Sequence, residues 1–210
     1  MYDRGLLDRP ADEVAPLLLG GLLSCRSPEG TVTLRLTEVE AYSGKGGDPG
    51  SHAHRGRTAR NAVMFGPSGH LYTYFTYGMH VCANVVTGAD GTAGGILFRA
   101  GEVIDGTDLA RRRRTTSTTE ADLARGPARL CVALGIELRD YGLDLFAPES
   151  RVTLSFPAVP TEAARIATGP RTGIAGEGAP IPWRFWLKDD PTVSPYRAHA
   201  PRRRSDPARS

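Results

Sequence analysis

Long hydrophobic runs are absent from this sequence, and cysteine is scarce in it. No apolar stretch approaches the roughly twenty residues that a membrane-spanning helix needs, and the start, MYDRGLLDRP, lacks the charged and apolar regions of a secretory signal. Cys25, Cys82 and Cys131 are odd in number, widely spaced and without a CxxC pair, which argues against a disulfide framework or a cysteine zinc site. We therefore expect a cytoplasmic protein whose thiols are reduced and lie in the core.

Lysine is nearly missing too, because Lys45 and Lys188 are the only lysines among 26 basic residues. The rest are arginines, and the net charge is +3. Arginine presents a planar fork that suits phosphate, so local arginine clusters favour a polyanionic partner. Each cluster alone is more often a solvated face than a binding site. The clusters are Arg55, Arg57 and Arg60, residues 111–114, and residues 202–204.

The length and composition predict one domain. A chain of 210 residues with 40% hydrophobic content can bury one sizeable core. We expect this domain to span residues 1–195. Residues 196–210 are rich in arginine and proline and short of apolar side chains, which predicts a disordered basic tail.

Local patterns predict helices and strands in alternation. Residues 11–23 predict a short helix, and residues 31–42 alternate apolar and polar side chains as a half-buried strand does. Residues 43–70 are glycine-rich and predict a long surface loop, which in a compact domain is usually functional. Further elements are expected as a strand at GILFRA, helical segments within 108–135 with Pro127 in a first turn, and a strand at 183–187.

Aromatic residues are concentrated in residues 71–86. Tyr72, Tyr74 and Tyr77 fall within six positions and directly precede Gly78. Gly78 can take the positive φ that a tyrosine resists, so the run predicts a hairpin with Tyr77 at its tip. An aromatic ring at such a tip is either buried in a core or held out to enter another molecule.

Alternation along the first strand of this hairpin separates its side chains into two sets. Leu71, Thr73 and Phe75 are expected to face the body of the domain. Tyr72 and Tyr74 are expected on the pocket side, with Tyr72 itself in the core.

Glu38 and Glu40 extend a face of the 31–42 strand that otherwise carries Val32, Leu34 and Leu36. A carboxylate on that face points inward, where ionisation is costly unless another group compensates. Glu40 is therefore a candidate general base that takes a proton from water. An exposed strand edge is the alternative interpretation.

Three polar residues near the aromatic run are further candidates. His52 and His54 form an HxH pair that could bind zinc, but no third ligand has a fitting spacing. Stacking or hydrogen bonding suits a loop histidine beside aromatic rings better. Asn84 lies in an otherwise apolar returning strand, so its amide is either satisfied by the backbone or contacts a ligand.

Five segments, taken in order, resemble the alkyladenine (3-methyladenine) DNA glycosylase family of the mammalian type. They are LTEVEAY, SHAHRGRTARN, MFGPSGHLYTYFTYGMHVCANVV, ILFRA and ARGPARLCVALGI. The resemblance runs from about Leu17 to Leu187 and is dense between Leu36 and Ala100. It implies a single mixed α/β (α+β) domain with a curved antiparallel sheet, surrounding helices and a protruding β-hairpin.

The resemblance also implies roles in the pocket. Glu40 matches the general base that activates the attacking water. Tyr42 and Tyr74 match the aromatic residues that stack on the extruded base, and His52 matches the histidine that closes the pocket. Because the alignment crosses a glycine-rich loop, His54 is the alternative to His52.

Other matched positions contact DNA or select the base. Tyr77 matches the residue that intercalates into the duplex, with Met79 and His80 beside it in the minor groove. Asn84 matches the asparagine that disfavours guanine, and Arg99 matches an arginine at the pocket and the DNA backbone. We also assign Arg57 and Arg60 to the DNA backbone or the pocket.

The implied activity is that of a monofunctional DNA glycosylase in base excision repair. It flips an alkylated or otherwise damaged purine out of double-stranded DNA and hydrolyses the N-glycosidic bond, with no metal and no cofactor. We expect a monomer, associated with the nucleoid if the source is bacterial. Lyase activity would need an amine, and Lys45 is the candidate nearest to Glu40.

Two alternatives remain at this point: a non-catalytic protein that binds damaged DNA, and a metal-dependent hydrolase built on the histidine pair. The sequence also departs from the family pattern at Asp189 and Asp190, where a small or neutral pair is expected. These acids either weaken DNA contact or face solvent. The preferred lesion, whether a methyl, etheno, deaminated or bulky adduct, is left open.

Overall fold

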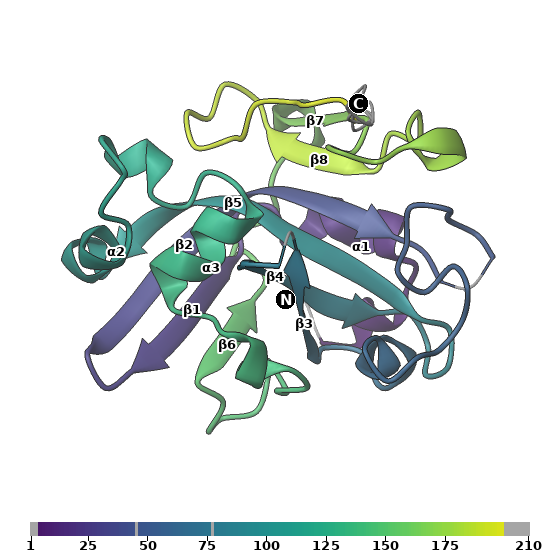
Figure 1. The fold of residues 1–210 in the computed structure, drawn as a ribbon. Coiled ribbons are helices and arrows are strands. Elements are labelled where there is room, and N and C mark those ends of the chain that lie inside the picture. The colour runs from purple at the N-terminus through teal and green to yellow at the C-terminus, as the bar shows by residue number, and fades with distance from the viewer. Residues whose placement is uncertain (1–3, 45, 77, 200–210) are drawn as a thin grey trace, which may run out of the picture.

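An antiparallel sheet of eight strands forms the centre of the molecule (Figure 1). The computed structural model describes residues 4–44, 46–76 and 78–199. The strands are β1 (Leu22–Ser27), β2 (Gly30–Tyr42), β3 (Leu71–Thr76), β4 (His80–Thr87), β5 (Gly94–Asp105), β6 (Val152–Ser155), β7 (Ile166–Gly169) and β8 (Arg184–Leu187). Their order is β3-β4-β5-β2-β1-β6, while β8 pairs with both β2 and β7. The predicted fold class is confirmed.

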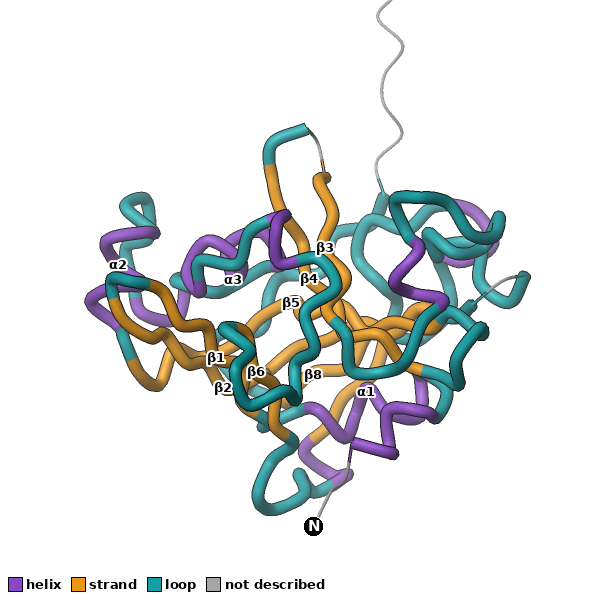
Figure 2. Tube along the Cα trace, turned by 90° about the horizontal axis from the view of Figure 1, so that it is seen from below, coloured by secondary structure: helices purple, strands orange, loops and turns teal. Residues whose placement is uncertain are grey.

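Helices cover both faces of this sheet. They are α1 (Ala11–Leu18), α2 (Thr107–Arg113) and α3 (Pro127–Leu134). Figures 1 and 2 show α1 and α3 on opposite sides of the strands. Fully buried side chains such as Leu18, Leu34 and Phe98 fill the core between them, and burying each contributes roughly 1.5–3 kcal/mol.

The observed boundaries correct some of the predicted ones. Helix α1 ends at Leu18, because the apolar residues that follow Gly21 form strand β1. The helical region 108–135 is divided into α2, a 3-10 turn and α3, with Pro127 in the first turn as expected. Strands β1, β6 and β7 were not predicted.

The pairing of β2 with β5 contains an irregularity that prepares the site. Glu38 lies opposite Ala100, and Val39 lies opposite Phe98, so Arg99 has no partner in the register. An extra residue of this kind bends the strand and redirects a side chain. The redirected side chain of Arg99 reaches Glu38 and Glu40 on the neighbouring strand.

Strands β3 and β4 form the predicted hairpin, which projects from the body (Figure 2). Gly78 has φ of +71°, as a tight tip requires, and Tyr77 lies outside the described residues. Leu71 and Thr73 are buried. The prediction for Phe75 is wrong: 49% of it is exposed, because the hairpin projects beyond the body at this point.

The remaining expectations concern the loop, the termini and the thiols. Residues 43–70 form the predicted loop, with one 3-10 turn at Ala62–Phe65. All three cysteines are buried and unpaired, as predicted. Within residues 4–199, no described helix is long and apolar enough to span a membrane. The boundary at residue 195 stays a prediction, and residues 200–210 lie outside the described part of the chain.

Candidate active site

Glu40, near the end of β2, is completely buried and has three donors around its carboxylate. Tyr42 donates its phenol hydrogen to Oε2 at 2.8 Å, and the backbone N–H of Thr172 donates to Oε1 at 2.7 Å. Nη1 of Arg99 lies 3.3 Å from Oε1. A carboxylate has about four acceptor positions, so one remains for a water molecule. The alternative of an exposed strand edge is wrong.

Glu38 is equally buried and accepts more hydrogen bonds than Glu40. Its Oε1 accepts hydrogen bonds from Nε of Arg99 at 2.9 Å and Nε of Arg184 at 2.5 Å. Ser194 donates its hydroxyl to Oε1 at 3.0 Å and its backbone N–H to Oε2 at 2.7 Å. Glu38 therefore serves as the counter-ion that keeps two arginines in place.

The charges of this cluster set the protonation of its members. Burial, together with the negative charge of Glu40, raises the pKa of Tyr42 well above its ordinary value, so Tyr42 remains a donor. Burial alone would lower the pKa of Arg99, but Glu40 and Glu38 raise it above its ordinary value. The site thus holds a cation between two carboxylates.

A cavity of about 80 Å³ opens beside Tyr42. Tyr42, Tyr74 and His52 line it, and the His52 and Tyr74 rings meet edge to face with centroids 4.5 Å apart. Nδ1 of His52 is within 3.0 Å of the Tyr72 hydroxyl. The aromatic residues from the loop, β2 and β3 thus form a slot suited to a flat ring.

The structure distinguishes the two loop histidines. His52 lines the cavity, whereas His54 does not, and Nδ1 of His54 is buried without a hydrogen-bond partner among the described residues. Partial burial and the nearby charge of Arg60 lower the pKa of His52 below its ordinary value of 6.5. His52 is therefore neutral at pH 7.

Asn84 and Tyr72 form another part of the cavity wall. Nδ2 of Asn84 donates to the backbone carbonyl of Tyr72 at 3.0 Å. The backbone therefore satisfies this amide, as one of the two alternatives predicted, and the residue also lines the cavity. Tyr72 is 2% exposed, as expected for a core residue.

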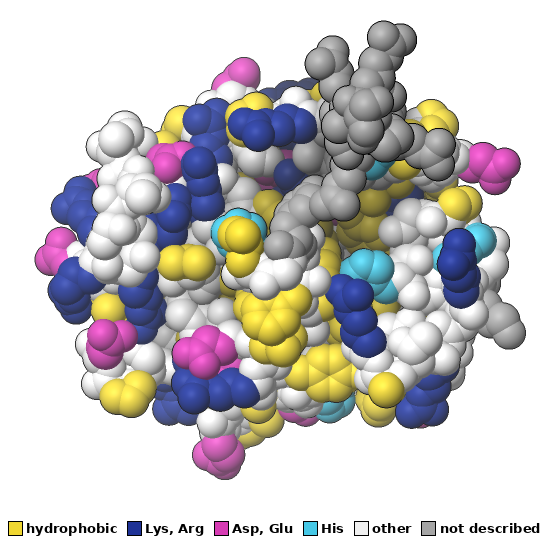
Figure 3. Space-filling view, viewed as in Figure 1, with side chains coloured by type: hydrophobic (Ala, Val, Ile, Leu, Met, Phe, Trp, Pro, Cys, Tyr) yellow, Lys and Arg dark blue, Asp and Glu magenta, His cyan; other side chains and the backbone are white. Residues whose placement is uncertain are grey.

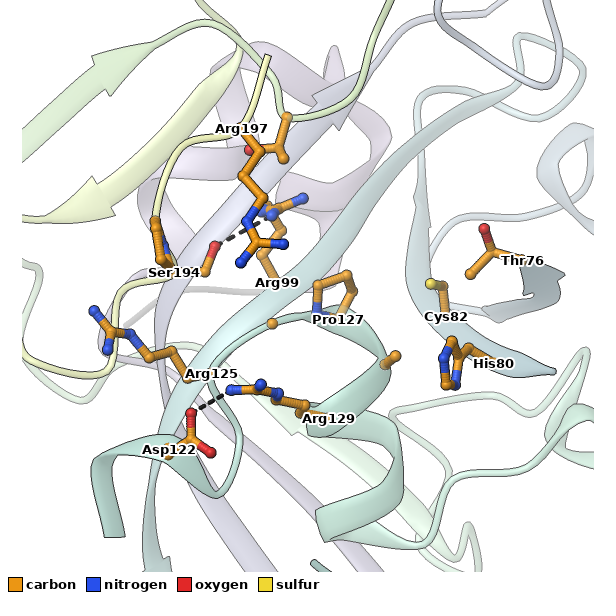
Figure 4. Close-up of a pocket in the computed structure, with 14 residues that line it drawn as sticks. Thr76, His80, Cys82, Arg99, Asp122, Arg125, Pro127, Arg129, Ser194 and Arg197 are labelled. Atoms are coloured by element: carbon orange, nitrogen blue, oxygen red, sulfur yellow. Dashed lines mark hydrogen bonds and ion pairs between the residues drawn. The ribbon is translucent and has the colours of Figure 1, made fainter. Parts of the chain in front are cut away.

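A second cavity of about 310 Å³ is lined by Arg99 (Figure 4) and Thr172, both of which contact Glu40. Three further arginines line it: Arg125 and Arg129 near the start of α3, and Arg197 in the C-terminal segment. Asp122 forms an ion pair with Arg129. The excess of guanidinium groups makes the cavity suited to an anion.

The β3–β4 hairpin lies between the two cavities and lines part of each. Figure 3 shows a hydrophobic patch near the centre of the face from which the hairpin projects, with basic side chains on both sides of it. Met79 is 71% exposed, and His80 is exposed next to it. Arg60 lies over the Tyr74 ring, 5.6 Å from its centroid, and donates to the Phe75 carbonyl at 3.0 Å.

A comparison with known families decides the identity. A profile of the family described as methylpurine-DNA glycosylase matches residues 5–191. The chain belongs to the methylpurine-DNA glycosylase family. The predicted enzyme class, a DNA glycosylase that hydrolyses N-glycosidic bonds in base excision repair, is confirmed by this membership, and damaged DNA is its binding partner.

Close relatives agree with this glycosylase assignment. A protein of Streptomyces avermitilis is 53% identical over 201 residues, which cover 96% of this chain and 94% of the relative. A protein of Leifsonia xyli is 56% identical, and the match covers 89% of this chain and 88% of the relative. One of Nocardia farcinica is 57% identical, covering 84% of each chain. All three carry the provisional name 3-methyladenine DNA glycosylase.

Asp189 and Asp190 take different places in this glycosylase. Asp189 is exposed. Asp190 turns inward, where it accepts hydrogen bonds from Arg35 at 2.9 Å and from the Thr192 hydroxyl at 2.6 Å. Asp190 therefore stabilises the turn after β8.

Sequence reasoning did not find several partners of the two glutamates. Thr172, Arg184 and Ser194 lie more than 130 positions after Glu38 and Glu40, and no periodicity marks them. The only signal was indirect: two buried carboxylates require donors from elsewhere in the chain. Residues that could hold a metal do not gather either, because no group of three His, Cys, Asp or Glu side chains forms among the described residues.

Proposed function

We propose that this glycosylase releases an alkylated or otherwise damaged purine by hydrolysis, with Glu40 as the general base. The observation that supports this most directly is the buried Glu40 carboxylate, which is hydrogen-bonded to Tyr42 in the wall of the aromatic cavity. Its fourth acceptor position can bind the attacking water and take a proton from it. Tyr42 and Thr172 fix the orientation of the carboxylate through their hydrogen bonds.

The aromatic cavity is the proposed site for the extruded base. Tyr42 and Tyr74 stack on the base, and His52 closes the pocket from the loop side. An alkylated purine carries positive charge, so it is a good leaving group, and electron-rich ring faces attract it. Asn84 presents its amide at the wall, where it can crowd the exocyclic amine of guanine.

Charge stabilisation follows from the same cluster. Breaking the N-glycosidic bond leaves positive charge on the sugar, and the Glu40 carboxylate stabilises that charge at short range. Arg99 is 6% exposed and held between the two glutamates. Arg99 contacts Glu40 and also lines the second cavity, so this place supports a role at either the pocket or the DNA backbone.

The hairpin and the arginines are the proposed DNA contacts. Base extrusion leaves a gap in the duplex that a protruding side chain fills, and we assign this to Tyr77 with Met79 and His80 in the minor groove. Phosphates bind arginines of the adjoining surfaces. These are Arg57 and Arg60 in the loop and, in the second cavity, Arg125, Arg129 and Arg197.

We propose that the enzyme is monofunctional and acts as a monomer on chromosomal DNA. A lyase needs a free amine near the sugar. Lys188 donates to the Ala164 carbonyl at 2.7 Å, and Lys45 lies outside the described residues. Release of the base without strand cleavage is therefore the expected reaction.

Mass-spectrometric product analysis tests this function. The protein is incubated with duplexes that carry a methylated, etheno, deaminated or bulky purine, with an unmodified duplex as control. We expect a free modified base, a strand that breaks only after alkali, and no effect of a chelator. Tight binding without any released base would show a non-catalytic damage-binding protein, and a borohydride-trapped adduct with strand cleavage would show a lyase.

A further inference from the structure

Arg171 forms the most deeply buried ion pair of the described chain. Both Arg171 and Asp48 have fully buried side chains. Nη1 and Nη2 of Arg171 donate to the two carboxylate oxygens of Asp48 at 2.5 and 2.7 Å. Taking two charges out of water is costly, so a pair of this kind needs an explanation from its surroundings.

The guanidinium of Arg171 also contacts the strand that carries the base-stacking residue. It donates to the Ala41 carbonyl at 2.9 Å and lies over the Tyr42 ring, 4.6 Å from the centroid. Tyr42 lines the aromatic cavity and Arg171 does not. Arg171 therefore supports the Tyr42 ring from the side away from the cavity. The same guanidinium also lies over the Trp183 ring, 5.4 Å from its centroid.

Asp48 connects the same pair to the loop that leads to His52. Its carboxylate accepts the backbone N–H of Gly50 at 2.9 Å and of Ser43 at 3.2 Å, and Gly50 lines the cavity. A Cβ on Gly50 would come within 2.9 Å of Nη2 of Arg171. The loop is thus packed directly onto the guanidinium, which leaves no room for a side chain at this position.

The residue after Arg171 completes the connection. Thr172 donates its backbone N–H to Oε1 of Glu40 at 2.7 Å. Because the Arg171 side chain is anchored on Asp48 and on the Gly178 carbonyl at 3.3 Å, it fixes the segment that presents this N–H. One guanidinium therefore contacts or anchors three parts of the site: the Tyr42 ring, the 48–52 loop and the donor to Glu40.

We propose that Arg171, held by Asp48, is the positioning residue that sets the orientation of Tyr42 and Glu40 for base release. This inference rests on the proposed function. Arg171 does not line the aromatic cavity, so it acts on the reaction through Tyr42 and Thr172. A lysine could neutralise Asp48 but could not also bridge Ala41, Gly178 and the ring face, because its ammonium is a compact point charge.

Single-turnover kinetics of Arg171→Lys test the proposal. With enzyme in saturating excess over a duplex from which the wild-type protein releases a base, the rate constant reports the chemistry. Circular dichroism and thermal unfolding of the same preparation report the folded fraction. Misplacement of catalytic groups by about 1 Å can cost on the order of 100-fold, so we expect the rate constant to fall at least tenfold. The dissociation constant for a duplex with a tetrahydrofuran abasic analogue should stay within threefold of wild type.

Arg151→Lys is the matched control. Arg151 holds Asp140 through contacts of 2.5 and 2.7 Å and the Gly135 carbonyl at 3.1 Å, and it lines neither cavity. It should keep the wild-type rate constant. In the double variant of Arg171→Lys with Tyr42→Phe, the fold-decrease in the rate constant should be smaller than the product of the two single effects, because both changes disturb one network. In the double variant of Arg151→Lys with Tyr42→Phe, the fold-decrease should equal that product.

The outcomes separate this inference from the proposed function. If Arg171→Lys does not fold, Asp48→Asn, which keeps the size of the side chain, replaces it with the same expectation. Active wild-type protein together with a folded variant that keeps the wild-type rate constant refutes the positioning role alone. A wild-type protein that releases no base from any duplex refutes the proposed function, and the positioning role with it.

Discussion

At the scale of single residues, the two glutamates of β2 show how environment separates chemical roles. Glu38 and Glu40 are two positions apart on one face and are equally buried. Glu38 accepts from two guanidinium groups and from both the backbone and the hydroxyl of Ser194. Glu40 instead accepts a hydrogen bond from Tyr42, which lines the aromatic cavity. This contact with the cavity wall is why we propose Glu40, and not Glu38, as the residue that binds the attacking water.

Strand periodicity could predict that both glutamates point inward, because the alternation of residues 31–42 continues through them. It could not distinguish one from the other. The difference is set by Arg184 and Ser194, which are remote in the chain and carry no motif. The family resemblance implied Glu40, and its role stays a prediction that the contact with Tyr42 supports.

His52 should make stability depend on pH. Its pKa lies below the ordinary value of 6.5, because partial burial and Arg60 disfavour the charged ring. Below pH 6.5 the unfolded chain binds more protons than the folded one, so stability falls as the pH falls through this window. Thermal unfolding of wild type and His52→Gln should therefore diverge, with wild type losing more on acidification. Parallel curves would contradict this assignment.

At the scale of elements, the sequence predicted the hairpin better than any other part of the fold. One detail of that prediction was wrong. The tyrosine run and Gly78 located both strands and the tip. The exposure of Phe75 was missed, because alternation gives the side of a strand but not how far the body extends beneath it. Sequence likewise missed β1, β6 and β7, which are short and lie outside the strongest alternation.

The exposed hairpin tip should contribute to DNA affinity. Met79 is 71% exposed, and burying an apolar side chain of this size against DNA is worth about 1.5 kcal/mol, which corresponds to roughly tenfold in affinity. Met79→Ser should therefore weaken binding to a lesion duplex about tenfold without changing thermal stability. Titrations of fluorescent duplex measure this.

Val159→Ser is the matched control for the hairpin. Val159 is also a strongly exposed apolar residue, at 78%, and it lines neither cavity. Its replacement should leave DNA affinity unchanged. Equal affinities for Met79→Ser and Val159→Ser would mean that the hairpin tip does not contact the duplex.

At the scale of the whole molecule, the site is assembled from distant segments around a central sheet. β2 supplies Glu40, β5 supplies Arg99, and the segment before β8 supplies Thr172. The single domain and its sheet followed from composition, periodicity and resemblance. The contacts between these segments could not be predicted from the sequence, because a local pattern carries no information about which remote donor meets which buried carboxylate.

The central claim, that the buried Glu40 activates water for base release, is tested most directly by single-turnover kinetics of Glu40→Gln. The amide keeps the size of the side chain but cannot take a proton, so the rate constant should fall on the order of 100- to 10,000-fold. Affinity for lesion duplex should stay near wild type. Glu102→Gln, which alters an exposed glutamate of β5, should react at the wild-type rate. Base release by Glu40→Gln at the wild-type rate would contradict the account.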